Sequence, residues 1–111
     1  MITAVVLTRN EEEGIEKCLR SLVWCDEILV IDDFSTDGTI RVIREIGVIR
    51  DKVQIIQKKS TGNMAEIRNF ALEKASKEWV FFVDADEVVT VELGREIVEK
   101  IKQTKDKSEG I

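Results

Sequence analysis

The sequence predicts an α/β fold with three layers, in which a mostly parallel sheet of strand order 3-2-1-4 is flanked by helices. Four short apolar runs alternate with stretches of helical periodicity, and strands that alternate with helices are joined by right-handed parallel crossovers. The run Trp79–Val83 is entirely apolar and contains aromatic and β-branched residues. Such a run is typical of a strand buried on both faces.

Local signals define the elements in chain order. After the first strand, Asn10 can cap a helix whose positive first turn would hold the three glutamates that follow it. Gly47 is expected to end the second helix, and the turn at 60–63 to precede the third. The expected strands are Ile2–Thr8, Glu27–Ile31, Val53–Gln57 and Trp79–Val83, and the later helices are Thr39–Ile46, Met64–Ser76 and Val91–Gln103.

The composition limits the class of protein. The 111 residues suffice for one domain with a core, which we predict at 1–103, followed by a polar tail at 104–111. The net charge of −5 argues against a nucleic-acid partner. No apolar run approaches the roughly 20 residues of a membrane span, and no basic segment precedes the first strand. A cytoplasmic location, or one peripheral to the inner face of the cell membrane, is therefore expected.

The chain has two cysteines and no histidine. Cys18 and Cys25 are expected to be buried thiols that act as small hydrophobic residues, because two cysteines without further Cys or His make no zinc site. Any general base or metal ligand must then be a carboxylate, an amine or water.

Two acids, Asp84 and Asp86, directly follow the last predicted strand. In open α/β folds, ligands bind where the strands end. Two acids in this spacing can share one divalent cation, and a cation allows acids to lie beside a phosphate. The D-x-D spacing therefore predicts a metal–phosphate site, although acids also follow strands simply because loops are solvated.

Polar clusters follow three of the four strands. They are Thr8–Glu11, Asp32–Ser35 and Asp84–Asp86, whereas Gln57–Lys59 after the third strand is interpreted as an ordinary solvated edge. In the order 3-2-1-4, the three clusters lie on neighbouring strands around the point where the strand order reverses. We expect them to face one crevice there.

Four segments together resemble the inverting family 2 glycosyltransferases of the GT-A fold, especially bacterial and archaeal members that build lipopolysaccharide core and cell-surface glycans. The resemblance covers nearly the whole chain and implies a nucleotide-diphospho-sugar transferase-like domain. Its implied ligands are a nucleotide-diphosphate sugar, foremost a UDP-sugar, with Mg²⁺ or Mn²⁺, and a glycan or lipid-linked acceptor. The segments are LTRNEE at 7–12, VIDDFSTDGT at 30–39, RNFALEKAS at 68–76 and FVDADE at 82–87.

The resemblance also implies residue roles. Asp33 would accept a hydrogen bond from the base imide, Asp84 would hold the ribose and Asp86 the metal. For Asp32 and Asp33, the alternative roles are turn formation and helix capping. Arg68 would reach the diphosphate, or else form a salt bridge with Asp84. The expected nucleotide-sugar ligands are Thr8, Arg9, Asn10, Glu11, Asp32, Asp33, Arg68, Asp84 and Ala85, and the expected metal ligands are Asp86 and Asp84.

One departure from the family concerns the general base. Family members carry roughly as many residues again after the D-x-D helix, and these supply the acceptor pocket and the catalytic carboxylate. Here Glu87 and Glu92 are the only nearby spare acids, and neither matches the family's general base. The alternative is therefore a nucleotide- or metal-binding module without transferase activity. A homodimer through an exposed apolar edge of the fourth strand is a further expectation.

Other enzyme classes fit less well. The segment FVDADEVV at 82–89 imitates the nucleophile motif of haloacid-dehalogenase-type phosphatases. That family places the motif on its first strand and needs later Lys and Asp motifs, for which too little chain remains. Neither GxGxxG nor GKS/T occurs, which argues against dinucleotide-binding and P-loop folds.

Overall fold

Four parallel strands form one sheet in the order β3-β2-β1-β4 in the computed structural model, which describes residues 1–106. The predicted fold class and strand order are confirmed. The elements are β1 (Ile2–Thr8), α1 (Ile15–Arg20), β2 (Glu27–Asp32), α2 (Thr39–Glu45), the 3₁₀ turn η1 (Gly47–Ile49), β3 (Val53–Gln57), α3 (Met64–Lys74), β4 (Trp79–Asp84) and α4 (Val91–Asp106).

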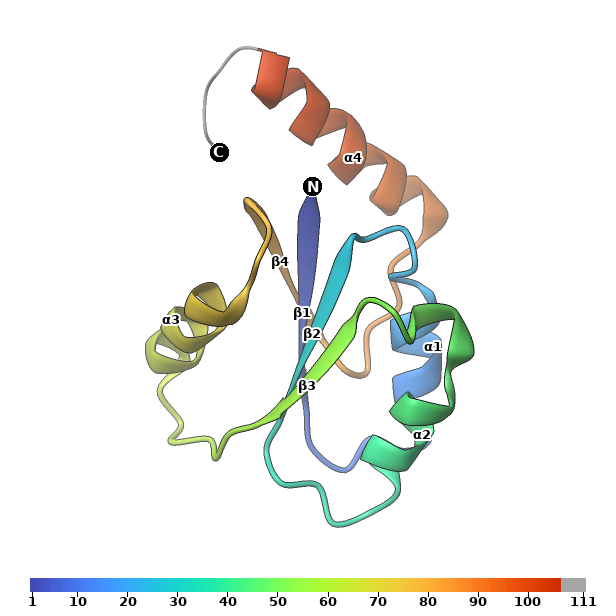
Figure 1. Cartoon of the computed structure of the whole chain (residues 1–111), viewed down its shortest axis with the longest axis vertical. Coiled ribbons are helices and arrows are strands. Elements are labelled where there is room, and N and C mark those ends of the chain that lie inside the picture. The colour runs from blue at the N-terminus through green and yellow to red at the C-terminus, as the bar shows by residue number, and fades with distance from the viewer. Residues whose placement is uncertain (107–111) are drawn as a thin grey trace.

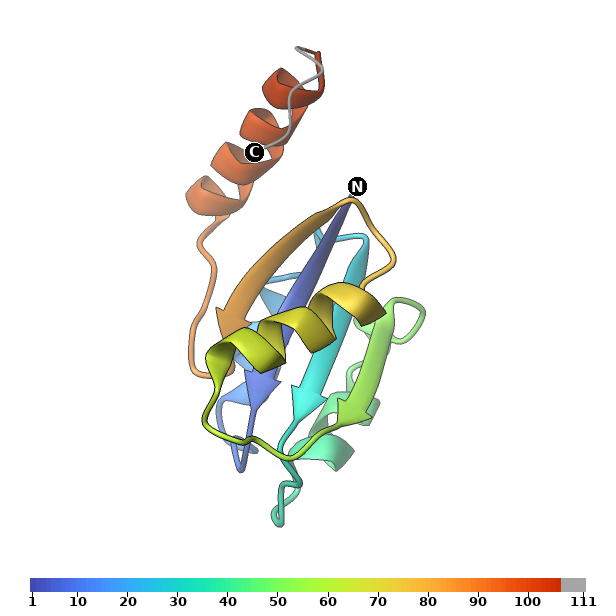
Figure 2. The ribbon, with the colours of Figure 1, turned by 90° about the vertical axis from the view of Figure 1, so that its left-hand side faces the viewer.

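Helices cover both faces of the sheet, with α3 on one face and α1 and α2 on the other (Figures 1 and 2). The central strand β1 explains this arrangement, because successive side chains of a strand point to opposite faces. Ala4 and Val6 belong to the core on the α1 side, whereas Val5 packs with Ala71 of α3. A strand with apolar residues on both faces requires a helical layer on each.

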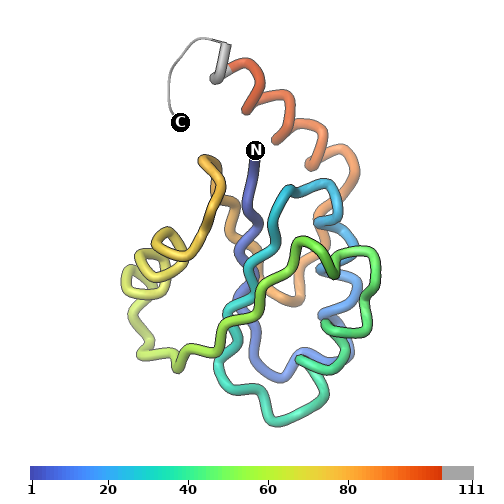
Figure 3. The backbone as a smooth tube through the Cα atoms, viewed as in Figure 1, coloured from blue at the N-terminus to red at the C-terminus, as the bar shows by residue number. Residues whose placement is uncertain are grey.

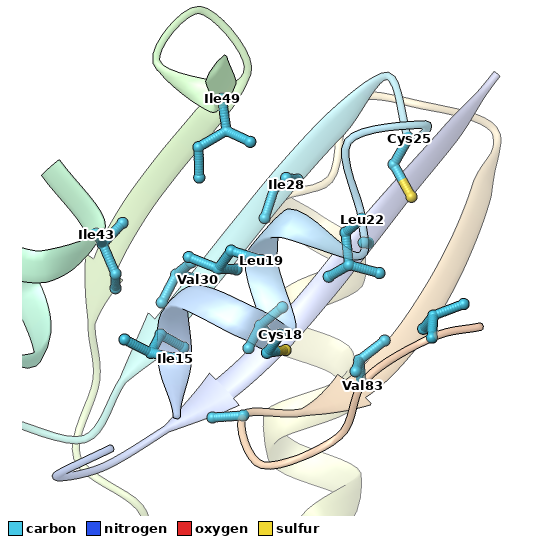
Figure 4. Packing of buried hydrophobic residues seen from close by; sticks show 14 of the residues in the cluster. Ile15, Cys18, Leu19, Leu22, Cys25, Ile28, Val30, Ile43, Ile49 and Val83 are labelled. Atoms are coloured by element: carbon cyan, nitrogen blue, oxygen red, sulfur yellow. The ribbon is translucent and has the colours of Figure 1, made fainter. Parts of the chain in front are cut away.

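The larger core lies between α1 and the sheet (Figure 4). Leu19 and Ile28 are fully buried within it, and each such side chain contributes about 1.5–3 kcal/mol relative to exposure. Cys18 and Cys25 are buried in the same core with free thiols, as predicted. Burial, together with the nearby carboxylate of Asp26, raises the pKa of Cys25 to about 12.

Strand β4 differs from its prediction. Residues 79–82 are only half-buried, and Val83 is the buried residue of the run expected to be covered on both faces. The reason is that β4 is an edge strand, which pairs with β1 on one side, while no strand of the described residues pairs with its other side. The apolar edge expected for a homodimer is therefore present, and the homodimer itself stays a prediction.

The helix boundaries also differ. Helix α1 begins at Ile15 after Gly14, so the expected cap at Asn10 is wrong. Helix α3 ends two residues earlier than expected, and α4 continues to Asp106, three residues further than expected. Residues 107–111 of the expected polar tail lie outside the described residues. None of the helices described is both long and apolar enough to cross a membrane.

A single carboxylate joins the amino ends of the strands to the segment after α3. Glu27 accepts hydrogen bonds from Thr3 Oγ1 at 2.7 Å and from the backbone N–H and hydroxyl of Ser76 at 2.9 and 2.8 Å. Burial alone would raise the pKa of Glu27, but these hydrogen bonds and the nearby Lys77 outweigh it and lower the pKa below its ordinary value.

We predict that Glu27→Gln destabilises the protein at neutral pH and not in acid. Because the pKa is lowered on folding, the ionised carboxylate stabilises the native state above its unfolded-state pKa, and this contribution is lost as the pH falls through the folded-state pKa. The free energy of unfolding should drop by about 1 kcal/mol at pH 7, and the difference should fade below about pH 4. Urea denaturation at both pH values, with exposed Glu73→Gln as control, measures this; a deficit equal at both pH values would contradict it.

Candidate functional site

A cavity of about 400 Å³ lies at the carboxyl ends of β2, β1 and β4, beside the start of α3. Figure 3 shows the loops that follow β1 and β2 next to each other at this end of the sheet. Thr8, Asp33 and Asp84 all line the cavity, so the prediction that the three polar clusters share one crevice is confirmed. The lining residues are Leu7, Thr8, Arg9, Glu11, Ile31, Asp33, Lys58, Ser60, Met64, Ile67, Asp84, Ala85 and Asp86.

A larger groove of about 580 Å³ lies elsewhere, between Trp24 and α4. Its walls are mostly apolar, with Val91 and Val98 among them, and Glu99 is the one carboxylate in its lining. The acids at the strand ends do not reach this groove. We therefore assign the candidate site to the smaller cavity, where the polar groups of several strands converge.

Thr8, the last residue of β1, offers an unused hydroxyl to the cavity. Its side chain is 6% exposed, and Oγ1 has no hydrogen-bond partner among the described residues. The great majority of buried polar atoms are hydrogen-bonded, and leaving one unpaired costs about 1–3 kcal/mol. An unpaired hydroxyl in the wall of a cavity marks a position where a ligand can supply the partner.

The two acids after β2 have different tasks. Asp32 is fully buried, lies outside the cavity lining, and accepts hydrogen bonds from the backbone N–H and hydroxyl of Ser35 and from Gln57 Nε2. Asp33 lines the cavity and uses Oδ1 to accept the Ser60 N–H at 3.1 Å, while its second oxygen makes no hydrogen bond within the described residues. Thus Asp32 shapes the loop, and Asp33 faces the cavity.

Asn10 holds two loops together and does not cap α1. Its backbone adopts φ of 51°, a conformation in which Asn is enriched. The side-chain oxygen accepts the N–H of Thr36 at 2.7 Å and that of Asp37 at 3.3 Å, and the Asn10 N–H donates to Ser35 Oγ. Asn10 lies outside the cavity lining, so it connects the β1 and β2 loops behind the site.

The D-x-D loop continues the strand for one residue and then turns. Ala85 is buried, and its N–H donates to the Leu7 carbonyl, which keeps the loop in register with β1. Asp84 and Asp86 on either side are exposed and line the cavity. The Glu87 carboxylate turns back to accept the Asp84 N–H at 2.8 Å. The two aspartates, at the end of β4 and in the turn that follows it, thereby line one space.

The cavity is negatively charged. Its lining carries four carboxylates (Glu11, Asp33, Asp84 and Asp86) against two cations (Arg9 and Lys58). The thiol of Cys18, which donates to the Asp84 carbonyl at 3.6 Å, responds to this charge. Burial, together with the carboxylates of Glu87, Asp86 and Asp84, raises the pKa of Cys18 to about 12.

For two basic residues, Arg68 and Lys58, the structure reverses the expectation of which one lines the cavity. Arg68 is exposed, lies 5.7 Å from the centre of the Phe82 ring, and neither lines the cavity nor pairs with Asp84 in the described structure. Lys58, interpreted from the sequence as part of a solvated edge, lines the cavity instead. The strand-end position of Lys58 was a usable signal, because it directly follows β3 as Asp33 follows β2.

No group of three or more His, Cys, Asp or Glu side chains in the described residues is arranged to enclose a metal ion. Asp84 and Asp86 nevertheless open into one cavity, and carboxylate oxygens are the preferred ligands of Mg²⁺ and Mn²⁺. The chain can thus supply part of a coordination shell, and the rest would come from a bound phosphate and water.

Comparison with known proteins places these features in a family. The model of the family described as Glycosyl transferase family 2 matches residues 3–108. The lipopolysaccharide core biosynthesis glycosyltransferase LpsC of Rhizobium meliloti (strain 1021) is 34% identical over 86 residues, which cover 78% of this chain and 32% of that protein. The SPbeta prophage-derived glycosyltransferase SunS of Bacillus subtilis (strain 168) is 35% identical over 92 residues, which cover 82% of this chain and 21% of that protein. The chain thus spans a third or less of the length of these relatives.

Solved structures agree with the sequence relatives. The crystal structure of S. aureus TarS 1-349 in complex with UDP superposes with a TM-score of 0.76 and 29% identity, covering 94% of this chain and 32% of that one. The mannosyltransferase PcManGT from Pyrobaculum calidifontis, in complex with GDP-Man and Mn²⁺, superposes with a TM-score of 0.66 and 30% identity, covering 78% of this chain and 28% of that one.

Adjacent substitutions should separate the two acids after β2. In Asp32→Asn, an amide replaces a buried carboxylate that accepts three hydrogen bonds, so we expect the free energy of unfolding to fall by about 1–3 kcal/mol. Asp33→Asn keeps an oxygen for the Ser60 N–H and should stay within about 0.5 kcal/mol of the parent. Urea denaturation measures both, and equal losses would contradict the division of tasks.

Proposed function

The chain belongs to glycosyl transferase family 2, and we propose on this premise that it binds a nucleoside-diphosphate sugar in the strand-end cavity, with a divalent cation held by Asp84 and Asp86. We propose further that the bound sugar is transferred to the hydroxyl of a glycan or lipid-linked acceptor. The observation that carries the proposal is one cavity that combines the D-x-D carboxylates, Asp33 and the unpaired hydroxyl of Thr8.

The charge of the cavity supports a metal-dependent mode of binding. A diphosphate is itself strongly negative, and the lining has two more carboxylates than cations. Bringing such a ligand beside Asp84 and Asp86 without a counter-ion is unfavourable, because like charges at close range repel in a partly enclosed site. A divalent cation between the carboxylates and the phosphates removes this repulsion.

The D-x-D residues fit Mg²⁺ or Mn²⁺. Mg²⁺ is commonly bound by one or two protein carboxylates together with substrate phosphates and water, and two carboxylates are what Asp84 and Asp86 provide. When bound, the cation would act as a Lewis acid that neutralises charge on the departing nucleoside diphosphate. The buried Ala85 anchors the loop against β1, so the two carboxylates stay directed into the cavity.

The other residues of the lining suit the nucleoside. The free oxygen of Asp33 can accept a base N–H, and the Thr8 hydroxyl can donate to or accept from the base or the ribose. Arg9 and Glu11 border the same space. A UDP-sugar is the donor that the TarS complexes with UDP and UDP-GlcNAc favour. Asp32 and Asn10, which lie behind the cavity, would act by fixing its loops, and Arg68 has no direct role in this scheme.

Neither Glu87 nor Glu92, the spare acids near the D-x-D loop, is placed to deprotonate an acceptor across the cavity. Glu87 is engaged with the Asp84 N–H, and Glu92 lies outside the lining. This favours binding without transfer for these 111 residues alone. A phosphatase of the haloacid-dehalogenase type is excluded as an alternative, since the D-x-D follows the fourth strand and the family match is to glycosyltransferases.

Loss of one D-x-D carboxylate should weaken metal-dependent nucleotide binding. We expect Asp86→Asn to weaken Mn²⁺-dependent UDP binding at least tenfold, because Asn supplies a neutral ligand in place of a charged one. Its free energy of unfolding should stay within about 0.5 kcal/mol of the parent, since Asp86 is exposed. Calorimetric titration with and without Mn²⁺ measures the effect. Glu92→Gln, the same change outside the cavity, is the control, and equal UDP affinity in Asp86→Asn and parent would refute the metal role.

The isolated chain should bind UDP-sugars and transfer none to an alcohol. General-base assistance contributes about 10²–10⁴-fold to rate, and acceptor positioning contributes further. Incubation with UDP-sugars, Mn²⁺ and acceptors should release UDP slowly and independently of the acceptor. Acceptor-dependent release would contradict the prediction. Repeating the assay across protein concentrations would show whether a second copy supplies the acid.

A further inference from the structure

Ser21, at the end of α1, is bonded to the far end of the loop that carries the D-x-D acids. Its hydroxyl accepts the Val89 N–H at 3.0 Å and donates to the Cys18 carbonyl at 2.6 Å. The hydroxyl therefore acts as acceptor and donor at once. Val89 is buried, and a buried backbone N–H needs a partner. Ser21 supplies that partner from outside the loop.

The near end of the loop also contacts α1. The Cys18 thiol donates to the Asp84 carbonyl at 3.6 Å. The same carbonyl accepts the Glu87 N–H at 2.9 Å, which closes a turn over residues 84–87. Asp86 occupies the third position of this turn. The two aspartates therefore belong to one short closed unit, and α1 is bonded to the chain at its start and just beyond its end.

Ser21 also fixes the surface against which α4 lies. The Ser21 carbonyl accepts a hydrogen bond from Trp24 Nε1 at 2.8 Å. A Cβ atom added at Gly94 would lie 3.3 Å from the Trp24 indole, so α4 approaches this ring closely through a glycine. Ser21 is thus connected to the loop by its side chain and, through Trp24, to the helix that follows the loop.

We propose that Ser21 is a positioning residue for a cation held by Asp84 and Asp86, an inference that rests on the proposed metal-dependent nucleotide binding. Ser21 lies outside the cavity lining, so it acts through Val89 and the loop. Mg²⁺ demands near-ideal octahedral geometry with ligands at about 2.0–2.1 Å, so two carboxylates that share such an ion tolerate little relative movement. By fixing the end of the loop, Ser21 limits that movement.

The test measures UDP affinity by calorimetry with Mn²⁺ in the parent chain, Ser21→Ala and Ser21→Thr. Loss of a group that orients metal ligands typically costs about 10–100-fold in metal affinity. Ser21→Ala leaves the Val89 N–H without its partner and should weaken Mn²⁺-dependent UDP binding about tenfold or more. Ser21→Thr retains the hydroxyl and should restore the affinity to within about threefold of the parent. Without Mn²⁺, Ser21→Ala and the parent should bind UDP equally.

Two further variants separate positioning from a general loss of stability. Leu29→Val removes one methylene group from the core on the α3 side of the sheet. It should lower the midpoint of urea denaturation, as Ser21→Ala does, and leave UDP affinity unchanged. Asp86→Asn already lacks one of the two carboxylates. Adding Ser21→Ala to it should cost less than about threefold further, because changes that act on one site are not additive.

Each contrary outcome is distinct. Parent-like affinity in Ser21→Ala would overturn the positioning role. An equal loss in Leu29→Val would show an effect of stability, and a Ser21→Thr variant as weak as Ser21→Ala would show that the hydroxyl is irrelevant; either would overturn the role as well. An equal loss without Mn²⁺, or a full further loss in Asp86→Asn, would place the effect outside the cation site and overturn it too. A parent that binds no UDP with Mn²⁺ would overturn the proposed function and this inference together.

Discussion

The buried carboxylate of Asp32 is the constraint on which the site depends. It ends β2 inside the protein, with no exposed surface, and accepts hydrogen bonds from Ser35 and Gln57. A buried charge is tolerated only when it is fully hydrogen-bonded. Asp32 therefore determines the path of the loop after β2 and its attachment to β3. With the backbone fixed on both sides, Asp33 must point into the crevice, and Lys58 must follow on the adjacent strand.

The crevice combines features that cost stability with features that favour a ligand. The hydroxyl of Thr8 is buried without a partner among the described residues, and four carboxylates line one small cavity. Neither feature helps the unliganded fold, because an unpaired buried group and like-charge repulsion are both unfavourable. A bound nucleotide and a cation would relieve both. Unfavourable features of this kind are expected at functional sites, because local preferences need not agree with the overall fold there.

Much of this arrangement could be predicted from the sequence, because it depends on local rules. Alternating apolar runs and helical periodicity are sufficient for the strand order and for the common crevice of Thr8, Asp33 and Asp84. What could not be predicted depends on contacts between distant segments. Asn10 satisfies the standard rule for a helix cap, yet a β2 loop 26 residues away supplies its hydrogen bonds. The apolar run of β4 does not reveal that the strand lies at an edge. Lys58 directly follows β3 and Arg68 lies within α3, and only the packing of α3 shows which of these two basic residues lines the cavity.

The loops around the crevice are held in place before any ligand binds. Asn10 joins the β1 loop to the β2 loop, Ser60 joins the β3 loop to Asp33, and the Ala85 N–H joins the β4 loop to β1. Every strand end is therefore connected to a neighbouring one by at least one hydrogen bond. Ordering a loop on binding reduces affinity, and a preorganised site avoids that cost. It also keeps the loops that follow β2 and β4 at a fixed separation, so that a ligand held correctly at one loop is correctly placed at the other.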